Sequence, residues 1–152
     1  MKIHEQLKRT HQSVLEIRDV RKQIKDLTRR LGDDPSKKAI VDSGKALDKK
    51  MTAVEEEIIQ TKSKAPQDPL NYSIKLNDKL AALGSTVESA DSAPTKQAYE
   101  VFDSLSQRLQ PQLTQWNAIK SGDLARFNDL VRQSVPPVIV TSEPKAAEEG
   151  NK

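Results

Sequence analysis

The sequence contains no cysteine, and its aromatic residues are limited to one tryptophan, two tyrosines and two phenylalanines. The lack of cysteine excludes disulfide bonds and thiolate metal sites, and it is compatible with an exported location because many bacterial exported proteins lack cysteine. With aromatics at only 3% of the chain, a core must consist mainly of Leu, Ile, Val and Ala. That composition is typical of a helical bundle.

Long apolar runs are also missing. No stretch approaches the roughly 18 to 20 apolar residues needed to cross a bilayer, and the first residues, MKIHE, lead into a charged periodic segment without the apolar region of a signal peptide. The sequence therefore predicts a soluble chain with no membrane span, and it leaves the compartment open.

The 152 residues suffice for one domain with a core and are too few to expect two. The charge is unevenly placed, since residues 1–64 carry 16 Lys and Arg against 11 Asp and Glu, whereas residues 65–152 carry 9 against 11. A basic half can bind nucleic acid or an anionic membrane, but here acids alternate with bases, which is usual for a solvated helix face. Nucleic acid is therefore a disfavoured partner.

The first expected helix covers residues 2–31. Gly32 follows its last apolar residue, where a glycine can close a helix in the left-handed conformation, and Arg29 and Arg30 lie in the last turn, where positive charge suits the helix dipole. Its apolar stripe consists of Ile3, Leu7, Val14, Ile17, Val20 or Ile24, Leu27 and Leu31.

The second expected helix covers residues 35–63, with Asp33 or Asp34 as its cap and Pro35 at the first helical position. Its stripe has the a/d spacing of a coiled-coil seam and consists of Ile40, Gly44, Leu47, Met51, Val54 and Ile58. A glycine in a helix costs roughly 0.5 to 1 kcal/mol relative to alanine, so Gly44 predicts a close approach of the partner helix. The first two helices are expected to form an antiparallel hairpin.

An extended connection containing Pro66 and Pro69 leads to the third expected helix, residues 73–90. The stripe of this helix consists of Leu76, Leu80, Leu83, Val87 and Ala90. The fourth expected helix covers residues 93–133, and its stripe consists of Ala98, Phe102, Leu105, Leu109, Gln112 or Leu113, Trp116 and Ile119. After the SGD segment the stripe resumes with Leu124, Phe127, Leu130 and Val131. These two helices are expected to form a second hairpin.

The fourth helix has three notable local features. Asp91 or Ser92 is its expected cap, with Pro94 in the first turn. Pro111 removes a backbone hydrogen bond and predicts a kink. The SGD segment near residue 122 is either a break with a fresh cap or a weak turn, and we expect the helix to continue through it with a bend.

The fold class that follows is all-α. We expect a four-helix bundle made of two antiparallel helical hairpins, covering residues 1–134 and held together chiefly by buried aliphatic side chains. In the tail, residues 135–140 are apolar and interrupted by two prolines, which predicts an extended segment laid along the bundle. Residues 141–152 are polar and charged, and we expect them to be disordered.

Candidate chemical groups favour structural roles. His4 and His11 lie two helical turns apart, about 10 Å along the axis, which is too far for both to bind one zinc ion. The carboxylates of residues 55–57 face successive sides of a helix and do not converge as an acid–base pair would, so we interpret them as a solvated face. No catalytic residue, metal site or cofactor is predicted.

Two further groups of residues have alternative interpretations. Trp116, Phe102 and Tyr99 could form a ligand platform, but Phe102 and Trp116 are fourteen residues apart on the seam spacing, which favours a place in the core. The densest basic cluster places Arg18, Arg21, Lys22, Lys25 and Arg29 on or beside one helical stripe. This stripe is a possible interaction surface for an acidic partner, and a solvated face is the default interpretation.

The stretch DPLNYSIKLNDKLAALGSTVESADSAPTKQAYEVFDSLSQRLQPQLTQWNAI, followed by DLARFNDLVRQSVPPVIV, resembles the C-terminal region of large bacterial proteins built on a β-propeller of BNR or Asp-box repeats. The segments IRDVRKQIKDLTRRL and EEEIIQTKSKAPQDPLN look like the same region, so the similarity extends to about residue 140. Such proteins are commonly described as glycosyl hydrolase-like or sortilin-like.

The resemblance implies a helical tail module of a protein that is usually exported to the periplasm or beyond. In that family any sugar-binding or hydrolytic site would lie on the propeller, no Asp-box pattern occurs in this chain, and no catalytic residue can be carried over. We therefore expect a non-catalytic accessory domain whose partner is a parent β-propeller or a second copy. The alternative is a free-standing coiled-coil adaptor whose basic first helix binds an acidic protein or nucleic acid, while a glycan-cleaving enzyme is a remote third.

Overall fold

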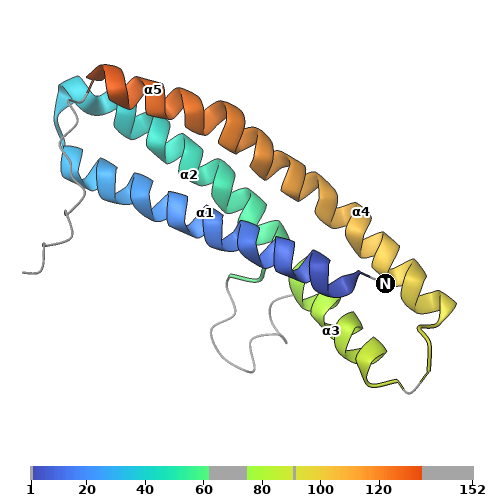
Figure 1. The fold of residues 1–152 in the computed structure, drawn as a ribbon. Helices are drawn as coiled ribbons and strands as arrows, with labels where there is room; N and C mark the ends of the chain where they lie inside the picture. The colour runs from blue at the N-terminus through green and yellow to red at the C-terminus, as the bar shows by residue number, and fades with distance from the viewer. Residues whose placement is uncertain (1, 62–74, 91, 135–152) are drawn as a thin grey trace, which may run out of the picture.

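A computed structural model of the chain describes residues 2–61, 75–90 and 92–134, and every regular element in these ranges is helical (Figure 1). The all-helical fold class is therefore confirmed. The elements are α1 (Ile3–Leu31), the 3-10 turn η1 (Pro35–Lys37), α2 (Lys38–Ile58), α3 (Leu76–Glu88), α4 (Lys96–Ala118), the π-helical segment η3 (Ile119–Asp123) and α5 (Leu124–Ser134). The expected proline-containing connection and the tail from residue 135 lie outside the described residues, so the statements about them stay predictions.

The end of α1 agrees with the sequence. Gly32 follows the helix with a φ of +59°, a backbone conformation that residues carrying a Cβ rarely adopt. Arg29 and Arg30 occupy the last turn, where their charge faces the negative end of the helix dipole. The glycine thus ends the helix at Leu31, as its position in the sequence predicts.

The bounds of α2 differ from the prediction at both ends. The Asp34 carboxylate accepts a hydrogen bond from the Ser36 backbone N–H at 2.9 Å, which confirms the acidic cap, but the first turn after this cap is the 3-10 turn η1. At the other end Ile59 is extended, with φ of −130° and ψ of 146°, so the helix stops at Ile58. Both isoleucines are β-branched, which disfavours continuation of a helix.

The start of α4 corrects the predicted cap. The Thr95 hydroxyl accepts a hydrogen bond from the Ala98 N–H at 3.2 Å, and Thr95 is the N-cap of the helix. Pro94 therefore precedes the cap and does not lie in the first turn, and Ser92 is not the cap; Asp91 lies outside the described residues. The hydroxyl of Thr95 reaches the free N–H groups directly, which is why it, and not an earlier polar residue, starts the helix.

The segments α4, η3 and α5 form one helical run from Lys96 to Ser134. Pro111 lies within α4 and does not end it, and the kink expected there stays a prediction. In η3 the Leu124 N–H donates to the carbonyl of Ile119, five residues earlier, so the expected continuation is confirmed and the weak turn is a π turn. A π turn absorbs one extra residue, which keeps Ile119 and Phe127 in the core although they are eight positions apart.

The helices pack side by side in one elongated body (Figure 1). α1 and α2 are antiparallel, and the run of α4 and α5 lies alongside them with the same direction as α1. α3 extends beyond the end of α2, where it packs against α4 and against the first turns of α1. α2 and α3 therefore follow one another along the body, and each contacts a different length of α1 and α4.

The core is continuous through all five α-helices. Gly44 marks a tight helix crossing, because a Cβ at this position would lie 3.0 Å from Thr28 Cγ2 and 3.1 Å from Ile24 Cγ2 of α1, and 3.4 Å from the Phe127 ring of α5. The predicted close approach at Gly44 is therefore confirmed. Trp116 is only 1% exposed, which also confirms its predicted place in the core.

Candidate interaction site

The predicted basic stripe does not form one open surface. Arg18 and Arg21 reach across to α2 and bind carboxylates there, and their side chains are 50% and 20% exposed. Lys22 and Lys25 are exposed and make no ion pair within the ranges that the structure describes. Arg29 pairs with an acid of its own helix at 2.7 Å. Two of the five cations thus join α1 to α2, and the other three make no ion pair with another helix within the described ranges.

Glu55 is the centre of the contact between α1 and α2. Its side chain is 3% exposed, and its two oxygens accept hydrogen bonds from Arg18 Nε and Arg21 Nη1, each at 2.5 Å. Arg21 also donates from Nε to Asp48 at 2.8 Å. Burial alone would lower the pKa of the Arg21 guanidinium, but its hydrogen bonds with Asp48 and Glu55 raise that pKa above the ordinary value. The cluster therefore ties α1 to α2 through both carboxylates.

The interpretation of residues 55–57 as a solvated face is wrong for Glu55, although Glu57 is exposed and Glu56 is partly exposed. A usable signal was present in the spacing. Asp48 and Glu55 are one heptad apart, and each directly follows a seam residue, Leu47 and Val54. Acids at that flanking position of an antiparallel pair face the partner helix, where Arg18 and Arg21 offer matching charges.

A second polar cluster joins α1 to the run of α4 and η3. Glu16 accepts hydrogen bonds from Trp116 Nε1 at 3.2 Å and from Lys120 Nζ at 2.9 Å, and the same ammonium lies 5.3 Å from the centre of the Trp116 ring. The hydrogen bond from Lys120 lowers the pKa of the Glu16 carboxyl; partial burial opposes this effect and the hydrogen bond from Trp116 adds to it. Because its polar atom is already bound, Trp116 is a core residue and not a ligand platform.

The remaining aromatic and histidine candidates lie on the surface or at its edge. Phe102 is partly buried against the core, whereas Tyr99 is 44% exposed. His4 is exposed and pairs with Glu88 of α3, and His11 is exposed. No cluster of three potential metal-binding side chains occurs within the described ranges.

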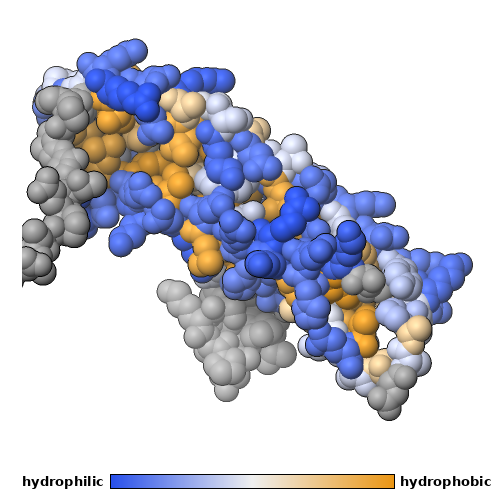
Figure 2. Space-filling model, viewed as in Figure 1, coloured by the Kyte–Doolittle hydropathy of each residue, from blue (hydrophilic) through white to orange (hydrophobic). Residues whose placement is uncertain are grey.

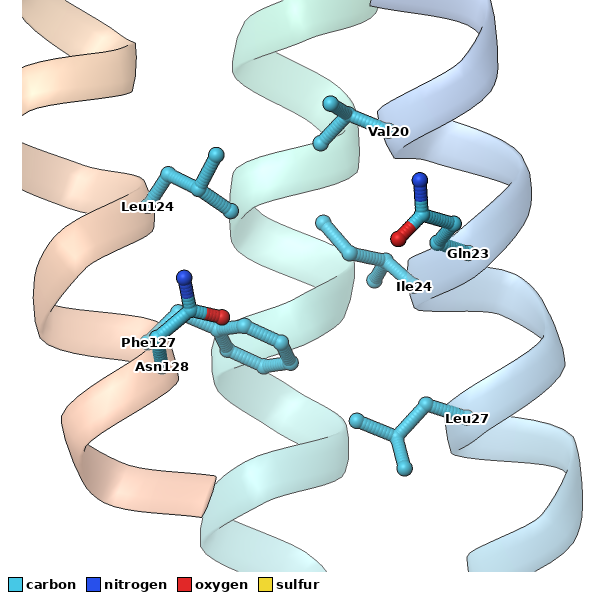
Figure 3. A pocket seen from close by; sticks show the side chains of 7 residues that line it. All are labelled: Val20, Gln23, Ile24, Leu27, Leu124, Phe127 and Asn128. Carbon is cyan, nitrogen blue, oxygen red and sulfur yellow. The ribbon is translucent and has the colours of Figure 1, made fainter. Parts of the chain in front are cut away.

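A largely apolar hollow forms a groove between α1 and α5, with a volume of about 270 Å³. Figure 3 shows the side chains of the two helices pointing toward one another, with the α2 ribbon behind them. Orange apolar atoms are also visible between α1 and α5 in Figure 2. The residues that line this α1–α5 groove are Val20, Gln23, Ile24, Leu27, Leu124, Phe127 and Asn128.

The groove follows from how the helices pack. α4 packs against both α1 and α2, whereas α5 packs chiefly against α2. Beyond η3 the run therefore leans onto α2 and leaves a space between α5 and α1. Ile24 and Phe127 are buried at the bottom of this space, and Val20, Leu27 and Leu124 on its walls are only partly buried. The sequence alone does not predict the groove, because the apolar residues that line it all belong to helical stripes that are expected to be buried.

Two other hollows have charged linings. One lies around the turn from α1 to α2, where Asp33, Asp34, Lys38 and Lys45 surround it. The other lies between α2 and η3, where Lys50 Nζ and Asp123 Oδ2 form an ion pair at 3.1 Å. Asp42 also lines the first hollow and Arg126 the second, so each lining mixes charges of both signs and neither presents a surface of one sign.

Comparison of the chain with protein-family models, with curated proteins and with solved structures found no match. Among the helices that the structure describes, none combines the length and the apolar character needed to cross a membrane.

Proposed function

We propose that this chain is a non-catalytic helical accessory domain, a four-helix module of two hairpins that spaces or supports a larger partner. The family resemblance suggests the partner, namely the β-propeller of an exported glycosyl hydrolase-like or sortilin-like protein of which this chain would be the C-terminal module. Contact with that propeller, or pairing with a second copy, would be the task of the bundle.

The observation that supports this role is the uninterrupted helical run from Lys96 to Ser134, with consecutive segments of 23, 5 and 11 residues. At 1.5 Å per residue it is about 55 to 60 Å long. α1, α2 and α3 pack along this run over its length. A long helix that packs against neighbouring helices is stiffer than an isolated one, and stiffness is the property that a spacer or support requires.

Polar contacts between helices reinforce this stiffness. Lys120 joins η3 to Glu16 of α1, Lys50 joins α2 to Asp123 of η3, and Lys37 donates to the carbonyl of Ser134 at the end of α5. Each contact fixes how far one helix can slide along its neighbour. Sliding by one turn would separate all of these pairs at once, so the body resists bending and shear.

Limited proteolysis of the chain with and without its natural upstream region tests the proposal. If the bundle packs against a propeller, both parts will be cleaved more slowly when they are joined than when they are mixed as separate fragments at low concentration. Equal cleavage rates in the joined and separate forms would contradict the proposal. A joined form with an added 30-residue Gly/Ser linker is the control, because it keeps the covalent connection and weakens the enforced contact.

The adaptor alternative has less support from the geometry. Arg18 and Arg21, which would carry much of the attraction for an acidic partner, are already bound to Glu55 and Asp48. An electrostatic complex with the first helix would weaken steeply with added salt. Binding that is independent of salt would exclude this version of the adaptor.

A further inference from the structure

The α1–α5 groove exposes apolar side chains on both of its walls. Its floor is closed by Ile24 and Phe127, but Val20, Leu27 and Leu124 keep part of their surface in contact with solvent. Covering such side chains with other apolar groups is favourable in proportion to the area removed from water. The groove is therefore suited to an apolar occupant, and none of the residues that line it carries a charge that would select a charged one.

The chain supplies an occupant of this kind directly after the groove's own wall. α5 ends at Ser134, and the Lys37 ammonium binds the carbonyl of that residue, which fixes the end of α5 beside η1. The next six residues, 135–140, read VPPVIV and contain four aliphatic residues and no charge. The last twelve, 141–152, are mostly polar and charged and offer little to bury. Apolar character is thus confined to the part of the tail nearest the groove.

The lengths also agree. From Ser134 back to Leu124 is about 15 Å along the axis of α5, and back to Asn128 about 9 Å. Six residues in an extended conformation span up to about 20 Å. Pro136 and Pro137 prevent continuation of the helix and favour extended backbone, so a chain that reverses after Ser134 can place residues 138–140 over the groove.

We propose that segment 135–140 docks in the α1–α5 groove of its own chain, with Val138, Ile139 and Val140 covering Leu27, Leu124 and the floor between them. The segment then acts as a strap that joins α5 to α1 where these two helices do not pack against each other. This inference goes beyond the accessory role and does not depend on any parent protein. A second copy of the chain and a foreign apolar peptide are the competing occupants.

Disulfide trapping tests the docking in the full chain, which has no natural cysteine to interfere. Gln23 lines the groove, and Lys22 is its exposed neighbour outside it. The variant carrying Gln23→Cys and Ile139→Cys is expected to form its intramolecular disulfide at least ten times faster than the matched variant carrying Lys22→Cys and Ile139→Cys. Equal rates, or no disulfide in either variant, would overturn the proposal. Predominant disulfides between chains would overturn it in favour of a second copy as the occupant.

Truncation provides an independent measurement. A chain that ends at Val140 keeps the strap and loses only residues 141–152, whereas a chain that ends at Ser134 loses both. In urea unfolding, the first truncation is expected to leave the unfolding equilibrium constant within about twofold of the full chain, and the second to raise it about tenfold or more. If both truncated chains unfold like the full chain, the strap contributes nothing and the inference is wrong.

Discussion

Glu55 places a carboxylate in the contact between two helices, where it would be strongly unfavourable without its two arginines. An ion pair of this kind adds little net stability compared with apolar residues of the same size. The ion pair instead fixes the register of the two helices, because a shift of α1 against α2 by one turn would leave Glu55 buried and unpaired. The apolar seam of α2 repeats regularly and would tolerate such a shift far better.

Removing this carboxylate should be costly. We expect Glu55→Ala to lower the free energy of unfolding by about 2 to 3 kcal/mol, less than for a fully buried pair because Arg21 keeps Asp48 and Arg18 can turn to water. The exposed Glu57→Ala is the matched control and should change stability by less than about 0.5 kcal/mol. Urea unfolding followed by circular dichroism measures both, and similar losses in the two variants would show that Glu55 is not a special contact.

Two glycines in helical segments should respond to alanine with opposite signs. At Gly44 the added methyl would press on Ile24 and Thr28 at about 3 Å, and we expect a net loss of about 1 kcal/mol despite the better helix propensity of alanine. At Gly122 the nearest atom is the flexible end of Arg126 at 3.8 Å, so Gly122→Ala should gain up to about 1 kcal/mol. Thermal unfolding distinguishes the two, and a stabilising Gly44→Ala would show that the crossing of α1 and α2 is not tight.

Glu16 makes stability depend on pH in a defined direction. Its pKa in the folded chain is lowered from the ordinary value of 4.5, chiefly by Lys120. A carboxyl whose pKa is depressed on folding stabilises the protein above its unfolded pKa, and this contribution disappears as the pH falls through the folded pKa. Between about pH 6 and pH 3 the natural chain should therefore lose more stability than the Glu16→Gln variant. Parallel urea midpoints for the two proteins across that range would contradict the role assigned to this carboxyl.

At the scale of the helices, the buried stripe of each helix is easier to predict than the residues at which the helix begins and ends. The stripe of α2 follows from the spacing of its apolar residues, and the end of α1 at Gly32 follows from the backbone conformation that glycine allows. Both are local properties of the sequence. The N-cap residue of α4 cannot be predicted in this way, because Ser92 and Thr95 both carry suitable hydroxyls and Pro94 is compatible with a helix that begins after either of them. Only the backbone geometry distinguishes them, through the hydrogen bond between Thr95 and Ala98.

This distinction gives a direct test. Thr95→Ala removes the acceptor for the Ala98 N–H and should cost about 1 kcal/mol, the usual effect of losing an N-cap. Ser92→Ala should change stability by less than about 0.5 kcal/mol, since Ser92 lies outside the helix. Chemical denaturation of the two variants side by side measures the difference, and a larger loss for Ser92→Ala would move the start of the helix toward the originally expected position.

At the scale of the whole molecule, the sequence predicted the number and order of the main helices but not how they lie against one another. Three adjacent glutamates, residues 55–57, look equivalent in the sequence, and only the register of α2 against α1 buries the first of them. The α1–α5 groove has the same origin, because Val20 and Leu124 belong to good apolar stripes whose partial exposure depends on α5 leaning toward α2. Relations between distant helices have no local signal, which is why both features were missed.

The continuous core leads to a prediction about cooperativity. Buried residues connect α1, α2 and the long run at one end with α3 at the other, where Ile3 packs beside Gly84. Because α3 shares its neighbours α1 and α4 with α2, it should not unfold separately. Helicity followed by circular dichroism and the fluorescence of Trp116, which reports on the middle of the body, should therefore give the same urea midpoint and the same denaturant slope. A loss of helicity that precedes the fluorescence change would show that the α3 end unfolds first, and that the bundle consists of two units and not one.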